Sequence, residues 1–238
     1  MEAGKTEFFP VTIADNFYDD PDAVREFALS LEYRAAENGD WPGKRTRPLA
    51  VIDKKLSEYC ISRFLSLYFD LSISQLDGWE ADTCFQLIEP FDKDKNSIKN
   101  KAWVHPDLCM LAGLVYLTPG ADLDAGTSIY QLKPGAVPDW SKTSERSKLH
   151  LTGKIDNEYK NAFIKHSNCF DETVTTKNVY NRVIGYDGCA FHSATNHNAG
   201  KPRLTQTFFL YNLKIKSWPP LKRLPQMIPF SSLVKKGP

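Results

Sequence analysis

Residues 102–119 read Ala-Trp-Val-His-Pro-Asp-Leu-Cys-Met-Leu-Ala-Gly-Leu-Val-Tyr-Leu-Thr-Pro. The runs at 102–105 and 110–117 predict two short β-strands, and turn residues from Thr118 onwards end the second. The sequence His-Pro-Asp lies at the end of the first strand. Side chains two positions apart on a strand point to the same side, so the His105 imidazole and the Asp107 carboxylate can converge on one point.

Similar runs recur through the rest of the chain and are separated by proline, glycine and aspartate clusters. They predict further strands at 83–88, 127–132, 181–186, 189–192 and 204–211. Two helices precede them. The first begins at Asp20-Pro21, a cap followed by a first-turn proline, and the second covers about 55–69. Helices followed by many short strands predict a mainly β protein, a sandwich or barrel with helices packed on its outside.

The composition indicates one globular domain in a reducing compartment. The 238 residues are 42% hydrophobic and 25% charged, which excludes a disordered chain. Thirty basic against 29 acidic residues create no overall field that would attract nucleic acid or a membrane surface. No apolar run approaches the length of a membrane span, and the first residues lack the pattern of a secretion signal. Five scattered cysteines without Cys-x-x-Cys favour the cytoplasm.

We expect a single domain over 1–238 that has three parts. Residues 1–78 form a helical buttress, 79–213 form the β core, and 214–238 form a basic, proline-rich strap. The polar stretch 133–177 within the core is too long for a turn, and we expect it to be an insertion that covers the substrate as a lid.

Three further residues extend the chemistry of His105 and Asp107. His192 follows an apolar strand, and Arg203 and Thr205 share one face of the next strand. Two histidines and one carboxylate are the facial set of ligands that binds ferrous iron. A guanidinium with a hydroxyl beside it suits a carboxylate ligand. The order His-x-Asp, long gap, His, Arg-x-Thr is therefore more specific than any of its parts.

In this order and strand context the chain resembles the Fe(II)- and 2-oxoglutarate-dependent oxygenases of the prolyl-hydroxylase-like group, in particular small uncharacterised members from bacteria and their viruses. The resemblance covers about 79–213 and rests on the segments 103–107, 112–119, 125–127, 181–187, 191–193 and 202–210. It implies a double-stranded β-helix, a jelly-roll core like that of the cupins. It also implies that His105, Asp107 and His192 hold the iron, and that Arg203, assisted by Thr205, pairs with the distal carboxylate of 2-oxoglutarate.

Two positions depart from the pattern of that group. Ala125 replaces the first glycine of a common Gly-Gly-Thr, which we expect to be harmless. The tyrosine that often precedes His-x-Asp is absent, because Trp103 and Val104 stand there. A second contact for the co-substrate must therefore come from elsewhere. Three side chains are candidates for it: Gln86, Tyr116 and Tyr186.

The resemblance implies a dioxygenase that hydroxylates an unactivated C–H bond while 2-oxoglutarate becomes succinate and carbon dioxide. The substrate would be a peptidyl side chain of the prolyl type, or a free amino acid or other small molecule. One alternative is a non-catalytic metal-binding β-barrel module, although such a module has no need of Arg203. Another is a nucleic-acid demethylase of the same superfamily. Those enzymes usually carry a second arginine six positions after the first, where this chain has Phe209.

Other histidines could compete for the metal or contact the substrate. His197 lies five residues after His192, but its neighbours have turn composition, so we favour His192 as the ligand. His150 and His166 lie in the polar insertion, where we expect them to be solvated.

Three other features have both a structural and a functional interpretation. The basic segment 41–47, with Arg45 and Arg47, is a solvated turn or, alternatively, a substrate-binding loop. Trp140 is expected to anchor the insertion by packing. The basic tail has prolines and few aromatic residues, so we do not expect it to bind nucleic acid.

Overall fold

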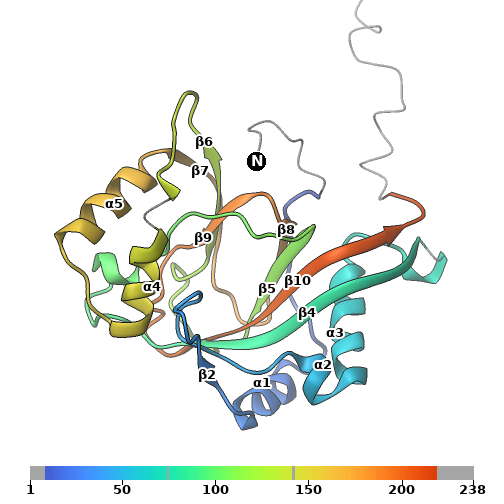
Figure 1. Cartoon of the computed structure of the whole chain (residues 1–238). Helices are drawn as coiled ribbons and strands as arrows, with labels where there is room; N and C mark the ends of the chain where they lie inside the picture. The colour runs from blue at the N-terminus through green and yellow to red at the C-terminus, as the bar shows by residue number, and fades with distance from the viewer. Residues whose placement is uncertain (1–8, 74, 141–142, 219–238) are drawn as a thin grey trace, which may run out of the picture.

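The computed structural model describes residues 9–73, 75–140 and 143–218 (Figure 1). The first part contains β1 (Thr12–Ala14), α1 (Pro21–Ser30), β2 (Arg34–Ala35), β3 (Lys44–Arg45), α2 (Leu49–Ile52), α3 (Lys54–Leu65) and the short 3₁₀ helix η1 (Leu71–Ile73). The second part contains β4 (Leu76–Ile88), η2 (Ile98–Asn100), β5 (Leu111–Tyr116), β6 (Thr127–Leu132), α4 (Thr143–Thr152), α5 (Asn157–Ser167), β7 (Phe170–Thr176), β8 (Val183–Asp187), β9 (Phe191–Ala194) and β10 (Arg203–Ile215). Most of the strap expected at 214–238 lies outside the described residues.

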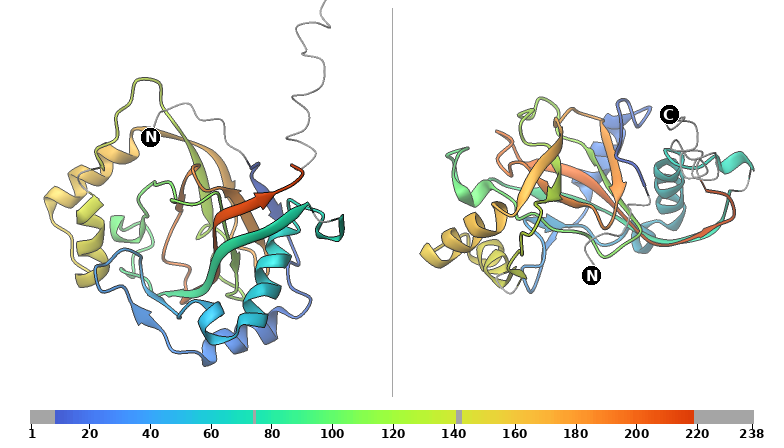
Figure 2. Two further views of the ribbon diagram at one scale, coloured as in Figure 1. Left: turned by 45° about the vertical axis from the view of Figure 1, so that its right-hand side comes forward. Right: turned by 90° about the horizontal axis from the view of Figure 1, so that it is seen from above.

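Two antiparallel sheets form the core. The larger sheet has the strand order β1-β8-β5-β10-β4-β3-β2, and the smaller one has the order β7-β6-β9. Figure 2 shows the chain from two further directions. The segment around His105 continues the smaller sheet beyond β9, because His105 and His192 exchange backbone hydrogen bonds of 3.0 and 2.9 Å. One cavity is lined by residues of both sheets. The predicted mainly β, jelly-roll architecture with flanking helices is confirmed.

The N-terminal helices pack on the larger sheet. The Asp20 side chain accepts a hydrogen bond from Ala23 N at 3.0 Å and so caps α1, whose first-turn proline has no N–H that would need an acceptor. On α3, the buried Phe64 ring stacks on Phe208 of β10 with centroids 4.6 Å apart. Gly113 of β5 makes this contact possible, because a Cβ there would lie about 2.5 Å from the Phe64 ring.

Several elements of the structure differ from the expected ones. The expected strand 102–105 is reduced to the single bridge at His105, and the second helix ends at Leu65 instead of 69. The insertion contains a strand, β7, that we did not predict. Four of its seven residues are exposed and polar, so the stretch lacks the apolar alternation that identifies a half-buried strand.

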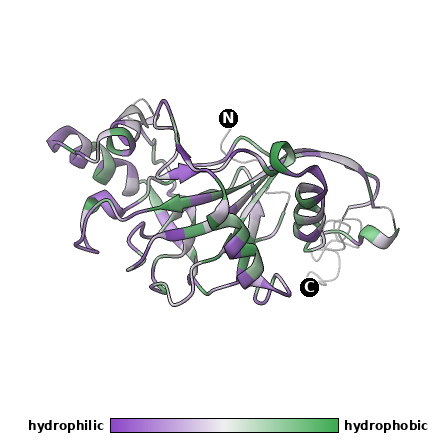
Figure 3. Cartoon of the chain, turned by 90° about the horizontal axis from the view of Figure 1, so that it is seen from below, coloured by the Kyte–Doolittle hydropathy of each residue, from purple (hydrophilic) through white to green (hydrophobic). Residues whose placement is uncertain are grey.

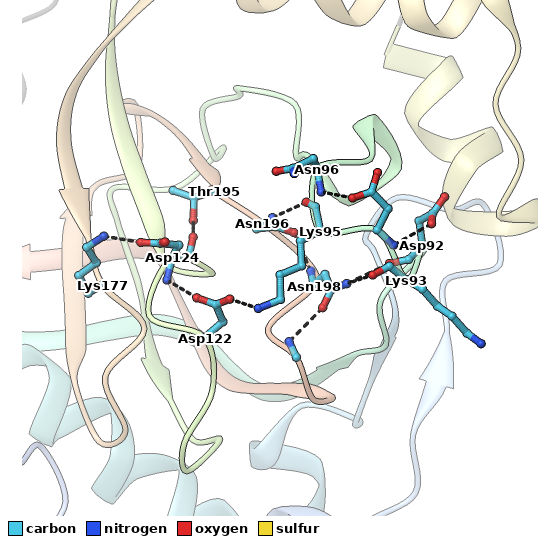
Figure 4. A network of polar contacts seen from close by, with 12 residues as sticks. Asp92, Lys93, Lys95, Asn96, Asp122, Asp124, Lys177, Thr195, Asn196 and Asn198 are labelled. Atoms are coloured by element: carbon cyan, nitrogen blue, oxygen red, sulfur yellow. Dashed lines mark hydrogen bonds and ion pairs between the residues drawn. The ribbon is translucent and has the colours of Figure 1, made fainter.

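A polar network joins three loops at one end of the sheets (Figure 4). The Asn198 amide donates to the carbonyl oxygen of Asp92 at 3.0 Å, and the Asn196 amide donates to that of Lys95 at 2.9 Å. Lys95 in turn forms an ion pair with Asp122. The network therefore ties the loop after β4 to the loops after β5 and β9, which flank the residues of the candidate site.

Figure 3 shows hydrophilic and hydrophobic residues interspersed along the helices. Within the described part of the chain, no helix is both long enough and apolar enough to cross a bilayer.

Candidate active site

The structure brings His105, Asp107 and His192 together in the cavity between the sheets. The Nε2 atom of His192 lies 3.3 Å from Asp107 Oδ2, and that of His105 lies 3.9 Å from Asp107 Oδ1. One ligand atom from each of the three residues lies within 4.8 Å of the other two, and no other such group occurs among the described residues. The bridge between His105 and His192 sets this arrangement, because it fixes the two backbones side by side.

The hydrogen bonds of the two imidazoles orient them toward Asp107. Nδ1 of His105 lies 2.8 Å from the carbonyl oxygen of Trp103, and Nδ1 of His192 lies 3.0 Å from that of Ala190. A carbonyl oxygen can only accept, so each Nδ1 carries a proton and Nε2 is the ring nitrogen that faces Asp107. Such outer contacts are typical of histidines that bind metals.

The electrostatics of this cluster favour a cation next to Asp107. Burial and the nearby His192 lower the pKa of His105 to about 3, although the Asp107 charge opposes this. For His192 burial lowers the pKa, but the charge and hydrogen bond of Asp107 outweigh it and the net pKa is raised. Burial raises the pKa of Asp107, and the positive charge of His192 reverses this to a lowered value. The carboxylate thus stays ionised and attracts positive charge.

Arg203 lies in the same cavity, and among the described residues no carboxylate forms an ion pair with it. Its side chain is buried, its Nε donates to the Ala125 carbonyl oxygen at 3.1 Å, and its Cζ lies 5.5 Å from the centre of the Tyr116 ring. Its Nη2 is buried without a hydrogen-bond partner in the described structure, and so is Oγ1 of Thr205. An unpaired buried guanidinium is costly, so the geometry fits a ligand carboxylate that completes it.

The three candidates for a second co-substrate contact differ in the contacts that they already make within the protein. The Gln86 amide donates to the Pro42 carbonyl oxygen at 2.8 Å and its oxygen accepts from Arg45, so the protein already satisfies both groups. Tyr186 packs on His192, with ring centroids 4.5 Å apart. Tyr116 lies beside Arg203, and its hydroxyl donates to Thr127 at 2.8 Å. Tyr116 thus contacts Arg203, but unlike Gln86 and Tyr186 it does not line the cavity.

A family model for DUF6445, described as a family of unknown function, matches residues 2–210. The chain belongs to this family. No curated protein matches the sequence.

Solved structures share the fold of this DUF6445 protein. The epimerase SnoN, crystallised with Fe³⁺, α-ketoglutarate and nogalamycin RO, is 15% identical with a TM-score of 0.50, over 85% of this chain and 78% of that one. A Trichoplax adhaerens prolyl hydroxylase in complex with a hypoxia-inducible-factor peptide is 12% identical (TM-score 0.49, 84% and 83% covered). HygX from Streptomyces hygroscopicus, with nickel and 2-oxoglutarate bound, is 11% identical (TM-score 0.49, 86% and 83% covered). The similarity to SnoN supports the double-stranded β-helix fold.

His197 of the DUF6445 protein is buried, contrary to the turn composition around it. It is 3% exposed and lines the cavity, and its backbone N–H donates to the Asn100 carbonyl oxygen at 2.7 Å. Burial, together with the charge of Arg203, lowers its pKa to about 3. It does not belong to the cluster of three ligand atoms described above.

The expectation that His150 and His166 are solvated is wrong. His166 is 1% exposed, and its Nε2 lies 2.8 Å from the carbonyl oxygen of Val104. His150 lines the cavity, with Nδ1 2.8 Å from the carbonyl oxygen of Gly39. Trp140 does anchor the insertion, because its ring stacks on Phe191 with centroids 6.2 Å apart.

The insertion is part of the site wall. Residues of α4 line the cavity, and α5 packs on the segment that carries His105, since Trp103 Nε1 donates to the Tyr159 hydroxyl at 3.2 Å. Arg146 on α4 was missed by the sequence analysis. The spacing of Arg146, Leu149 and His150, which all line the cavity, could have indicated one shared helix face. Arg45 also lines the cavity, whereas Arg47 is exposed.

Proposed function

We propose that this DUF6445 protein is an Fe(II)- and 2-oxoglutarate-dependent dioxygenase that hydroxylates an unactivated C–H bond. The observation that carries the proposal is the occurrence, in one cavity, of a His-Asp-His cluster and a buried arginine without a counter-ion. A non-catalytic metal module would account for the cluster and leave Arg203 unexplained.

The residues fit the metal and the co-substrate. His105, Asp107 and His192 supply two nitrogen ligands and one oxygen ligand, the set that suits non-haem Fe(II) and leaves further positions open. The bound iron would supply dioxygen activation coupled to the conversion of 2-oxoglutarate into succinate and carbon dioxide. The carbonyl oxygens of Trp103 and Ala190 hold the imidazoles in the orientation that binding needs.

Arg203 would bind the distal carboxylate of 2-oxoglutarate through its unpaired Nη2, with the Thr205 hydroxyl assisting. The hydrogen bond to Ala125 and the Tyr116 ring beneath the guanidinium fix its position before the ligand arrives. Apolar cavity residues such as Leu114 exclude water from the reacting groups.

The cavity of about 620 Å³ has the size of a small-molecule site. It suits the co-substrate together with one amino-acid side chain or one small molecule, so we propose a peptidyl, prolyl-type substrate or a free amino acid. All five cysteines are free, which supports the proposal that the protein works in a reducing cytoplasm.

The test is stepwise loading without oxygen followed by exposure to air. Fe(II) and then 2-oxoglutarate are titrated into the protein while the absorption of the complex is recorded, and succinate is measured after oxygen is admitted. We expect the wild type to bind both ligands and to form succinate. The Asp107→Ala variant should neither bind the two ligands nor form succinate. Binding of both ligands without succinate would favour the non-catalytic module. Absence of Fe(II)-dependent 2-oxoglutarate binding would contradict the proposal.

A further inference from the structure

Arg45 lies in the cavity wall with its guanidinium near two aromatic rings. Its Cζ is 4.8 Å from the centre of the Trp41 ring and 5.5 Å from that of Phe209. Its Nη2 donates to Gln86 at 3.4 Å, a long hydrogen bond, and its Nε is buried without a partner. No ion pair of Arg45 with a carboxylate occurs among the residues that the structure describes.

Arg146 of α4 lines the same cavity and resembles Arg45 in its unsatisfied guanidinium. Its Nε is buried without a partner, and across residues 9–73, 75–140 and 143–218 it forms no ion pair. The acidic cavity residues Asp40 and Asp82 lie outside ion-pair distance of either arginine. Burial therefore has the larger effect on Arg146 and lowers its pKa, although the charge of Asp40 opposes this.

Both arginines line the cavity that also holds His105, Asp107 and His192. The charge of Asp107 acts on Arg45 and on Arg146, which places both side chains within electrostatic range of the same carboxylate. Beside Arg45, the indole N–H of Trp41 is a further buried donor without a partner. In the part of the chain that the structure describes, these two arginines and Trp41 thus contribute two positive charges and three buried N–H groups that have no acceptor.

A single 2-oxoglutarate does not account for these donors, because its distal carboxylate is assigned to Arg203 and its other end to the metal. We propose that Arg45 and Arg146 bind an anionic group of the substrate, a carboxylate or a phosphate. The inference rests on the proposed function, since it takes the remaining cavity to be the substrate site. It implies that the carbon to be hydroxylated and the anionic group of the substrate both lie in this one cavity.

The guanidinium fork favours oxyanions because it donates parallel hydrogen bonds to two oxygens, and these charge-assisted bonds are stronger than neutral ones. The Trp41 and Phe209 rings hold the Arg45 side chain in place, so binding costs little of its conformational freedom. Both features predict a preference for an anion over a neutral group of the same shape.

The test uses the full-length protein loaded with Fe(II) and saturating 2-oxoglutarate without oxygen. Benzoate, phenyl phosphate and benzamide are titrated by calorimetry at constant ionic strength; the first two carry the anion, and benzamide has the same ring without charge. We expect benzoate or phenyl phosphate to bind at least about 10-fold more tightly than benzamide, the gain of one charge-assisted contact. The tighter of the two distinguishes a carboxylate from a phosphate substrate.

Arg45→Gln and Arg146→Gln should each reduce the anion affinity about 10-fold and leave the affinities for benzamide and 2-oxoglutarate within about two-fold. Arg45→Lys should retain part of the preference. The matched control is Arg47→Gln, an exposed arginine two positions away, which should behave as wild type. Equal binding of all three probes by the wild type would overturn the inference, as would a preference that survives in the double variant.

Two further outcomes separate this inference from the proposed function. If Arg45→Gln weakens 2-oxoglutarate as much as benzoate, Arg45 belongs to the co-substrate site and the inference is wrong. If the wild type fails to bind Fe(II) and 2-oxoglutarate, the proposed function is contradicted. The anion preference is then measured on the unloaded protein, where its absence would overturn the inference as well.

Discussion

The inner end of the cavity and its outer wall are built in different ways. At the inner end, His192, Arg203 and Thr205 lie on β9 and β10, and each is held by paired strands. The outer wall takes Arg45 from the two-residue strand β3 and Arg146 from α4 of the insertion. The paired strands β9 and β10 hold residues that we propose to bind the metal and the co-substrate. The short strand β3 and helix α4 carry the two arginines that we propose to bind the substrate. Such a division lets substrate preference change without disturbing the ligands.

The two regions are nevertheless in contact. The Trp103 indole donates to the Tyr159 hydroxyl, and the Val104 carbonyl oxygen lies 2.8 Å from Nε2 of His166. Both contacts join the insertion to the residues immediately before His105. The insertion therefore packs on the segment that carries His105 and also contributes to the cavity wall.

Removal of the metal ligands should have the largest effect. We expect His105→Ala, Asp107→Ala and His192→Ala each to weaken ferrous binding by more than about 100-fold, since even the loss of an outer hydrogen-bond partner of a ligand costs 10- to 100-fold. Competition with a chromophoric chelator without oxygen measures this. His197→Ala, a buried histidine of the same cavity, is the control and should keep its iron. Loss of iron in that variant alone would reassign the ligand.

The next effect concerns Arg203. Arg203→Ala should weaken 2-oxoglutarate binding by roughly 30-fold to several thousand-fold, because truncating one partner of a buried charge pair costs about 2–5 kcal/mol. Ferrous affinity should change little, and Arg203→Lys should recover part of the loss since an ammonium lacks the fork. Titration of the absorption band of the metal–co-substrate complex gives both affinities. An unchanged midpoint in the alanine variant would show that the carboxylate binds elsewhere.

The contact between the two regions can be tested at Tyr159, which is 1% exposed. Tyr159→Ala should lower the free energy of unfolding by about 3–5 kcal/mol, as for other large buried aromatic side chains. It should also weaken iron binding, because Trp103 loses its partner. Urea unfolding and the chelator assay measure the two quantities. Tyr59→Ala, at a half-exposed tyrosine of α3, is the matched control and should change stability by less than about 0.5 kcal/mol.

The same comparison explains what the sequence could predict. The order His-x-Asp, His, Arg predicted that His105, Asp107, His192 and Arg203 line one cavity. The alternation of a strand places Arg203 and Thr205 on one face of β10, whereas the segment of His105 and Asp107 forms only the bridge at His105. Arg146 was missed, because it reaches the cavity only through the packing of the insertion. His197 was misjudged for a different reason. The turn-like asparagines beside it are buried and donate to the loop after β4, so polar composition did not mean exposure.

His197 gives the smallest and most specific prediction. Its pKa falls from 6.5 to about 3 in the folded protein, mainly through burial, whereas the unfolded chain takes up a proton near pH 6.5. Below pH 6.5 the unfolded state therefore binds more protons than the folded state. The stability that the neutral, buried imidazole contributes is complete above pH 6.5 and is lost as the pH falls toward 3.

His197→Gln removes this titration and keeps a side chain that can form hydrogen bonds. The free energy of unfolding of the metal-free wild type should fall between pH 5.5 and 4.5 more steeply than that of the variant, by up to about 1.4 kcal/mol per pH unit, the value for one proton. Urea unfolding at both pH values measures the two slopes, and the comparison of slopes does not depend on any constant loss of stability caused by the substitution. Equal slopes would mean that His197 is protonated in the folded state, and that the inner end of the cavity admits water and charge as freely as its outer wall.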